Sequence, residues 1–278
     1  MRNQPHILIT NDDGIDAEGI KQLYLSLKSI ARISIVAPQR DQSATSLSLT
    51  IQHPLKVEEV NWGDKTPAWS VNGTPADSVK LALSVLVSTP PDLIISGINR
   101  GSNAGRNILY SGTVACAIEA ALRGIPSIAF STYNMLTPKY EEAVQHIPSI
   151  VEHVLTHPLP DGTLLNVNFP GTELQADYQK IQGFKMTHQG KEYFLENPDI
   201  RQHPVQKSPY YWLGLRRGEC VEQEDCDIKW LQKGYVTAVP LHVSELTDRS
   251  HLLAKRDNFE NSLNSKLGQV HANSIQTH

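Results

Sequence analysis

The chain has 278 residues, of which 40% are hydrophobic and 6% aromatic, and its formal net charge is −4. This composition is typical of a soluble α/β protein with a full core, and no apolar run approaches the roughly 18 residues of a membrane span. No segment concentrates positive charge among aromatic residues, which argues against a groove for a nucleic-acid polymer. Three cysteines are too few for a disulfide framework and the N-terminus shows no signal-peptide pattern, so we expect a cytoplasmic protein with reduced thiols.

The first half of the chain alternates short apolar runs with helical patterns. Residues 6–10 (HILIT) and 32–38 (RISIVAP) predict two strands, and a helix is expected between them behind a cap at Asp16. Thr74 is the expected N-cap of a second helix over residues 74–87. Pro75 stands at its first helical position, and Asp77 is expected to reach back to the cap. Further strands are predicted at 92–97, 127–131 and 164–170, and further helices at 113–124, closed by Gly124, and at about 141–155.

The predicted strands are apolar throughout instead of alternating, which is typical of a parallel sheet with helices on both faces. We therefore predict an α/β core over residues 1–182, with a Rossmann-like, doubly wound, mostly parallel sheet. Residues 183–278 are predicted to form a hairpin arm, a returning strand at 234–241 and a C-terminal helix, and to take part in oligomerisation. The aromatic stretch SPYYWLG, residues 208–214, fits a subunit contact, which we favour, a base-stacking surface or part of a core.

Polar residues follow the predicted strands. Because ligands bind beyond the carboxyl ends of the strands in an open parallel sheet, we expect these residues to meet at one rim. They are rich in oxygen donors and include no cysteine or histidine, which suits Mg²⁺ or Mn²⁺ and does not suit zinc. They are Asn11, Asp12 and Asp13 after the first strand, Ser43 after the second, Asn99 and Asn103 after the strand at 92–97, and Ser111, Gly112 and Thr113 at a helix start.

The adjacent carboxylates of Asp12 and Asp13 repel each other unless something positive lies beside them. A divalent cation would relieve the repulsion, and Gly14 would let the backbone leave strand geometry so that both carboxylates converge. The helix that starts near Thr113 offers unpaired N–H groups to a phosphate, and Gly112 permits close approach. A cation beside such a helix start indicates phosphoryl transfer or phosphate-ester hydrolysis. Taken singly, each pattern also fits an ordinary turn or helix cap.

Five stretches carry these residues, in the order ILITNDDGIDAEGI, VAPQRDQSATSLSLT, VNGTPADSVKLAL, DLIISGINRGSNAG and YSGTVACAIEAALRGIPSIAFS. Together they resemble the SurE survival-protein family of metal-dependent 5′/3′-nucleotidases. The likeness is dense across residues 6–131 and thinner later, in YYWLG and GYVTAVPLHVSELT.

The resemblance implies a phosphomonoesterase that hydrolyses nucleoside monophosphates with one divalent cation per subunit, Mg²⁺ or Mn²⁺. It also implies a homodimer or homotetramer in which the later hairpins and the C-terminal segment are exchanged. The implied cation ligands are Asp12, Asp13, Ser43 and Asn99. The expected catalytic residues are Asp12, Asp13, Asn103 and Ser111, and the expected substrate contacts are Asn11, Ser43, Asn103, Ser111, Gly112 and Thr113.

Two stretches depart from the family pattern. Arg106 and Asn107 stand where the family commonly has an acidic pair, which makes the rim less negative. EDCD, residues 224–227, stands where the family usually has Gly-Thr-Asp, which puts the geometry around Asp227 in doubt. Neither departure touches the implied cation ligands.

The expected mechanism has Asp13 accepting a proton from an attacking water while Asp12 is chiefly a ligand. An aspartyl-phosphate on Asp12 is also chemically possible. The main alternative is a Rossmann-like regulatory protein that binds a nucleotide without hydrolysing it. A haloacid-dehalogenase-type phosphatase would need Asp-x-Asp after its first strand, whereas the aspartates here are adjacent and followed by Gly14.

Overall fold

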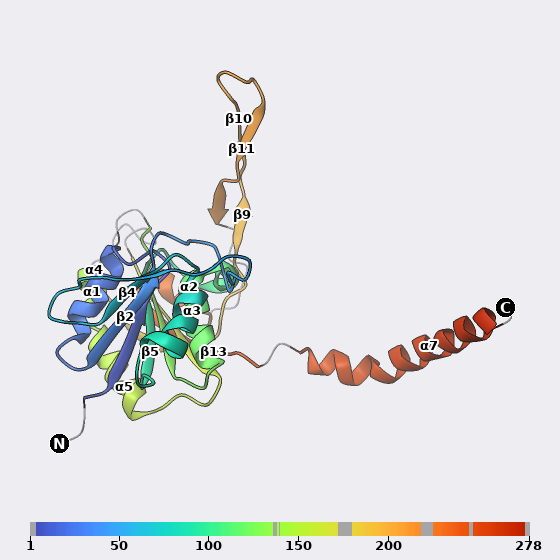
Figure 1. Ribbon diagram of the computed structural model, residues 1–278, viewed down its shortest axis with the longest axis horizontal. Helices are drawn as coiled ribbons and strands as arrows, with labels where there is room; N and C mark the ends of the chain where they lie inside the picture. The colour runs from blue at the N-terminus through green and yellow to red at the C-terminus, as the bar shows by residue number, and fades with distance from the viewer. Residues whose placement is uncertain are drawn as a thin grey trace. The chain divides into compact units, whose positions relative to one another are not determined.

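The computed structural model describes residues 4–135, 138, 140–171, 180–217, 225–244 and 247–275. Its main feature is a nine-stranded sheet (Figure 1). In spatial order the strands are β3 (Val57–Glu59), β4 (Ala68–Val71), β2 (Arg32–Pro38), β1 (His6–Thr10), β5 (Leu93–Arg100), β6 (Ser127–Thr132), β7 (Thr163–Phe169), β13 (Tyr235–His242) and β8 (Gly183–Met186). The six strands from β4 to β7 in this order run parallel to one another. β3 is antiparallel to β4, and β13 is antiparallel to β7 and parallel to β8.

Helices cover both faces of this sheet, and the alternation of side chains along each strand divides the core in two. Ile7 and Ile9 of β1 pack on the face covered by α1 (Glu18–Leu27), α4 (Tyr140–Val144) and α5 (Ile147–Thr156). Leu8 packs on the opposite face with α2 (Pro75–Leu81) and α3 (Gly112–Ala121). The predicted doubly wound, mostly parallel fold is therefore confirmed.

Local sequence signals explain where the helices begin. Thr74 and Asp77 form the predicted capping box of α2, with bonds of 3.1 Å and 2.9 Å between the side chain of each and the backbone N–H of the other. The predicted cap at Asp16 is wrong. Residues 14–17 form a turn in which the Ala17 N–H bonds the Gly14 carbonyl, so α1 begins after Ala17 without a side-chain cap.

Several elements differ in extent from the sequence expectation. The strand expected at 92–97 continues to Arg100, so Asn99 lies on β5 and not in the loop after it. The helical stretch expected at about 141–155 is two helices, α4 and α5. The second predicted helix is α2 followed by the π-helix η1 (Ala82–Leu86). Elements with no clear sequence signal are the short strands β3 and β4, the 3₁₀ helix η2 (Gly105–Tyr110) and α6 (Asp227–Gln232).

The expected arm consists of two short antiparallel pairs, seen in Figure 1 as a long hairpin. β9 (Phe194–Glu196) pairs with β12 (Leu215–Arg217), and β10 (Asp199–Gln202) pairs with β11 (Pro209–Trp212). Tyr211 and Trp212 are 64% and 63% exposed, so the core interpretation of the aromatic stretch is wrong for these rings.

The chain divides into two units, residues 1–242 and 243–278. β8 and β13 lie beyond residue 182 yet belong to the main sheet, because β13 pairs with β7 on one side and with β8 on the other. The second unit contains α7 (Arg249–Ile275), which lies where a C-terminal helix was predicted. Within the described ranges, no helix combines the length and the apolar character needed to cross a membrane.

Candidate active site

The turn after β1 places the two aspartates at the carboxyl end of the sheet. β1 ends at Thr10, and Gly14 adopts a φ of +102°, which an L side chain rarely takes, so the backbone leaves strand geometry as predicted. Asn11 closes the turn: its Nδ2 donates to the Gly14 carbonyl at 2.8 Å, and its Oδ1 accepts from the Gly14 N–H at 3.2 Å. Both ends of the Asn11 amide are thus engaged inside the turn.

Asp12 is wedged against the start of α3. It is 3% exposed, and its Oδ1 accepts a hydrogen bond of 2.6 Å from the Thr113 hydroxyl. A Cβ added to Gly112 would lie 2.6 Å from the Asp12 Cβ and 2.9 Å from its Oδ2. Only glycine therefore allows this approach, which confirms that the aspartate turn and the helix start meet.

Asp13 lies beside the end of β5 and is half-buried. Its Oδ2 accepts a hydrogen bond of 3.3 Å from the Arg100 N–H, one residue after Asn99. The two aspartates thus contact different neighbours, Asp12 the helix and Asp13 the strand. This difference favours separate roles for the two carboxylates.

Burial raises the pKa of both carboxyl groups. Burial raises the pKa of Asp12 from its ordinary value of 3.8 to about 7, against the opposing effect of the Thr113 hydrogen bond. Burial also raises the pKa of Asp13, while the hydrogen bond from the Arg100 backbone lowers it. The nearby carboxylate of Asp41 raises both pKa values further. Because burial destabilises the ionised form of both carboxyl groups, a bound cation would stabilise that form.

Ser43 comes from the loop after β2 and Asn99 from the end of β5, the two strands on either side of β1. The Gln42 N–H donates to the Asp12 carbonyl at 2.8 Å, which brings the loop carrying Ser43 to the aspartate turn. The Ser43 hydroxyl itself is exposed and donates to Asp41 Oδ1 at 2.6 Å. Asn99 Nδ2 donates to the Gly101 carbonyl at 2.8 Å, so the oxygen end of its amide is the one that would bind a cation.

The start of α3 has the form of an anion-binding helix end. Ser111 is the N-cap, and its hydroxyl oxygen accepts from the Val114 N–H at 3.1 Å while its own proton stays available to donate. The helix begins at Gly112, whose N–H belongs to the first turn and has no partner within the helix. The Thr113 side chain is fully buried against Asp12, so only its backbone N–H could meet a substrate.

Asn103 is held by a buried set of hydrogen bonds that the sequence analysis missed. Its Nδ2 donates to the Ser131 hydroxyl at 2.8 Å and faces the Thr113 hydroxyl at 3.4 Å. Its backbone N–H donates to Asn168 Oδ1, and its carbonyl accepts from Asn166 Nδ2, both at 2.8 Å. A signal was present in the sequence LLNVNF, where two amides interrupt an otherwise apolar strand.

The two departures from the family pattern have structural roles. The Asp227 carboxylate is fully buried and accepts the N–H groups of Gly105, Gly190 and Ile228 at 2.8–2.9 Å. Asn107 Oδ1 accepts from the Phe194 N–H at 3.0 Å, and the Arg106 N–H donates to the Glu192 carbonyl at 2.8 Å. These bonds join the loop after Asn103 to the base of the arm.

The donors at this rim fit a hard divalent cation. Among the described residues, no three side chains of the His, Cys, Asp and Glu types gather as a metal site, so hydroxyl, amide, water or phosphate oxygens would have to complete the shell. Two carboxylates with such oxygens match the preference of Mg²⁺ and Mn²⁺. Cys116 is buried behind the site, and burial raises the pKa of its thiol to about 12, which makes it a poor ligand.

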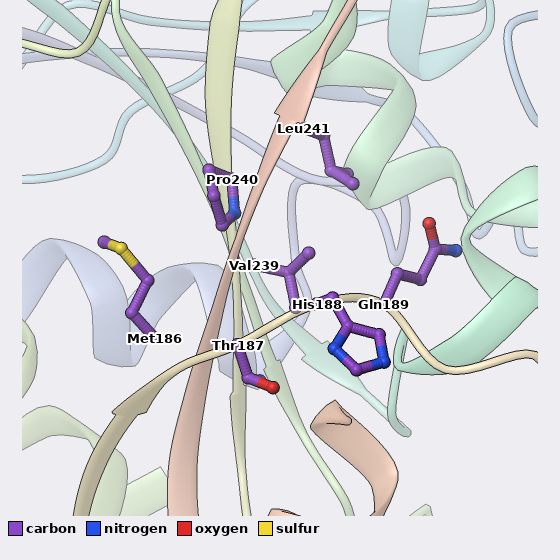
Figure 2. Close-up of a pocket in the computed structure, with 7 residues that line it drawn as sticks. All are labelled: Met186, Thr187, His188, Gln189, Val239, Pro240 and Leu241. Atoms are coloured by element: carbon purple, nitrogen blue, oxygen red, sulfur yellow. The ribbon is translucent and has the colours of Figure 1, made fainter. Parts of the chain in front are cut away.

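A larger hollow of about 480 Å³ lies where β8 ends beside β13. Figure 2 shows it lined by residues 186–189 and 239–241, whose side chains are mostly apolar or neutral. It contains no carboxylate, so we assign no cation to it. A smaller hollow of about 300 Å³ lies by the loop that contacts Asp12 and is lined by Gln39, Arg40, Gln42, Val71 and Asn72.

Fold and rim together define a doubly wound α/β protein with an acidic, oxygen-lined site at the carboxyl edge of its sheet. The profile of the family described as Survival protein SurE matches residues 7–196. A protein of Protochlamydia amoebophila named 5′-nucleotidase SurE is 51% identical over 265 residues, covering 95% of this chain and 100% of that protein. A 5′-nucleotidase SurE of Crocosphaera subtropica is 40% identical, covering 87% of this chain and 90% of that protein.

A solved structure agrees with these relatives. The crystal structure of the SurE protein from Aquifex aeolicus superposes with a TM-score of 0.76 and 37% identity, covering 91% of this chain and all of that one. The chain belongs to the SurE family.

Proposed function

We propose that this protein is a divalent-metal-dependent phosphomonoesterase that hydrolyses nucleoside monophosphates to nucleoside and phosphate. The observation that carries the proposal is the contact between Asp12 and the start of α3, because a carboxylate that could bind a cation lies there beside N–H groups that could bind a phosphate. The names of the relatives, 5′-nucleotidase SurE, support the same activity. No observation favours the alternative of a regulatory protein that binds a nucleotide without hydrolysing it.

One divalent cation, Mg²⁺ or Mn²⁺, would be held by Asp12 and Asp13, with Ser43 and Asn99 as the hydroxyl and amide ligands. Such a cation polarises a phosphate and stabilises the negative charge that develops on it. Asp12 is the better fixed of the two carboxylates, since it is nearly inaccessible and bonded to Thr113.

The protein's own groups supply the remaining steps. Asp13 is half-exposed, so it could accept the proton of a water that attacks the phosphorus atom. The N–H groups of Gly112 and Thr113 and the Ser111 hydroxyl would donate to the phosphate oxygens as the ester bond breaks. Asn103 would add its amide N–H by releasing the long contact to Thr113.

The smaller hollow supports a nucleoside as the leaving group. Its lining includes the amide residues Gln39, Gln42 and Asn72 and the basic residue Arg40, next to the loop that contacts Asp12. Amides present both donors and acceptors and so match the edges of a nucleobase.

The test of this proposal is phosphate release from 5′-AMP with Mn²⁺, before and after EDTA. We expect turnover with Mn²⁺ and its loss after chelation, restored when Mn²⁺ or Mg²⁺ is added back in excess. Binding of 5′-AMP with no phosphate released under any metal condition would support the regulatory alternative instead.

The stability of the metal-free protein should fall as pH rises from about 4 to about 7. The folded state holds the Asp12 proton up to about pH 7, whereas the unfolded state releases it near 3.8. Raising the pH through this window therefore stabilises the unfolded state relative to the folded state. We expect Tm to fall by at least about 2–4 °C, the shift that 1 kcal/mol produces in a domain of this size. The measurement is Tm from pH 4.5 to 8 in EDTA.

Asp12→Asn is the matched variant for this measurement, because it keeps the acceptor for Thr113 and cannot ionise. Its Tm should fall less than that of the wild type over the same window, because only Asp13, whose pKa is also raised, still titrates at this site. A wild-type Tm that rises from pH 5 to pH 7 would contradict the raised pKa.

Self-association as a homodimer or homotetramer also belongs to this proposal. The exposed rings of Tyr211 and Trp212 on the arm support it, since aromatic residues are enriched in subunit interfaces. The expected cytoplasmic location is likewise proposed.

A further inference from the structure

We propose that Asn166 and Asn168 of β7 are positioning residues that hold Asn103 in place for the phosphate. This inference rests on the proposed function. Neither residue touches the cation ligands, and neither was expected as part of the site.

The placement of the two amides is unusual for a buried strand. β7 lies between β6 and β13, and Asn166 and Asn168 are both fully buried. Their neighbours Leu165 and Val167 pack on the face of α1 and α5, so the two amides point to the α3 face. Burying an amide costs free energy unless it is hydrogen-bonded, so these residues need a role that apolar ones could not fill.

That role is visible in their partners. Asn168 Oδ1 accepts the Asn103 N–H at 2.8 Å and the Ser102 hydroxyl at 3.1 Å. Asn166 Nδ2 donates to the Asn103 carbonyl at 2.8 Å. Asn168 Nδ2 also faces Asn166 Oδ1 at 3.4 Å, which links the two amides. The backbone of Asn103 is therefore held on both sides by one strand.

The fixed backbone of Asn103 is linked to Asp12 through the side chains of Asn103 and Thr113. With its backbone fixed, the Asn103 side chain points to Ser131 and Thr113, and Thr113 in turn donates to Asp12. The loop that carries Asn103 has no helix or strand of its own until η2 begins at Gly105. β7 thus supplies the rigidity that this loop lacks.

Asn168→Leu tests the proposal, because leucine has a similar size and lacks both polar atoms. We expect kcat/KM for 5′-AMP to fall about 10- to 100-fold, as for lost support of a site residue. The inhibition constant of inorganic phosphate should rise, while the affinity for Mn²⁺ should change less than about twofold. Asn168→Asp keeps the acceptor for Asn103, and we expect it to be about 3- to 10-fold more active than Asn168→Leu at equal folded fraction.

Thr237→Val is the matched control. Thr237 lies on β13, directly opposite Asn168 of β7, and is fully buried. Its hydroxyl has no hydrogen-bond partner in the described part of the chain. This variant should keep wild-type kinetics. Ser102→Ala is a milder test at a half-buried position and should lower kcat/KM about 2- to 5-fold, because it removes the bond to Asn168 and the bond that the Ser102 hydroxyl accepts from the Ala104 N–H at 3.1 Å.

The outcomes separate the two proposals. Wild-type protein that releases no phosphate overturns the proposed function and this inference together. Active wild-type protein with a folded Asn168→Leu variant of equal kcat/KM overturns the inference alone, as does an equal loss of Mn²⁺ and phosphate affinity. If Asn168→Leu does not fold, unchanged kinetics in both Ser102→Ala and Asn168→Asp overturn it.

Discussion

Replacing Asp13 with asparagine should leave the fold intact and reduce phosphate release from 5′-AMP by more than about 100-fold. That value is the upper end for loss of a merely supporting group, and Asp13 is proposed both to hold the cation and to accept a proton. Asparagine has nearly the same shape and can still accept the Arg100 N–H at 3.3 Å, so the turn should survive. The measurements are kcat/KM with Mn²⁺ and the affinity for Mn²⁺, both of which should fall.

Asp16→Asn is the control for the change in charge. Asp16 lies three residues away on the same turn, is exposed and caps nothing. Its removal should leave kcat/KM within about twofold of wild type. Near-normal turnover by the Asp13→Asn protein would reject the assignment of Asp13 to the site.

Replacing Gly112 with alanine should be nearly as damaging, although it adds a single methyl group. The new Cβ would lie 2.6 Å from the Asp12 Cβ and 3.0 Å from Pro75 Cγ, so either the carboxylate or the helix must move. A displacement of about 1 Å at a reacting centre can cost about 100-fold in rate. We expect a loss of that order in kcat/KM and a weaker affinity for Mn²⁺.

The sign of the stability change distinguishes this result from a plain helix effect. Alanine is favoured over glycine by about 1 kcal/mol inside a helix, and Gly112 is the first residue of α3, so without the clash Gly112→Ala would leave Tm unchanged or raise it. We expect a lower Tm. An active variant with a raised Tm would contradict the close approach of Asp12 to α3.

Most of the fold could be predicted from the sequence because its strands carry a local signal. Buried parallel strands are apolar throughout, and the runs at 6–10 and 32–38 match β1 and β2 residue for residue. The capping box at Thr74 was likewise a local pattern. β3 and β4 were missed because they are three and four residues long and depend for their shape on pairing, β3 with β4 and β4 with β2.

The candidate site was only partly visible for a related reason. Asp12, Asp13 and Ser111 follow predicted strands or open a predicted helix, so their common rim could be inferred from topology. The contacts of Asn103 with Asn166 and Asn168 span 63 and 65 residues, and no local pattern records them. The turn-closing bonds of Asn11 also depend on the conformation of Gly14 and not on residue type alone.

The buried carboxylate of Asp227 has a consequence for how the protein matures on the ribosome. It accepts hydrogen bonds from the N–H groups of Gly105, next to the loop of Asn103, and of Gly190, which precedes the arm. Asp12, Asp13 and the start of α3 are synthesised within the first half of translation, whereas Asp227 is synthesised more than a hundred residues later. Nascent chains that contain the six parallel strands but end before residue 227 therefore lack these bonds, and we expect activity to arise only near the end of synthesis.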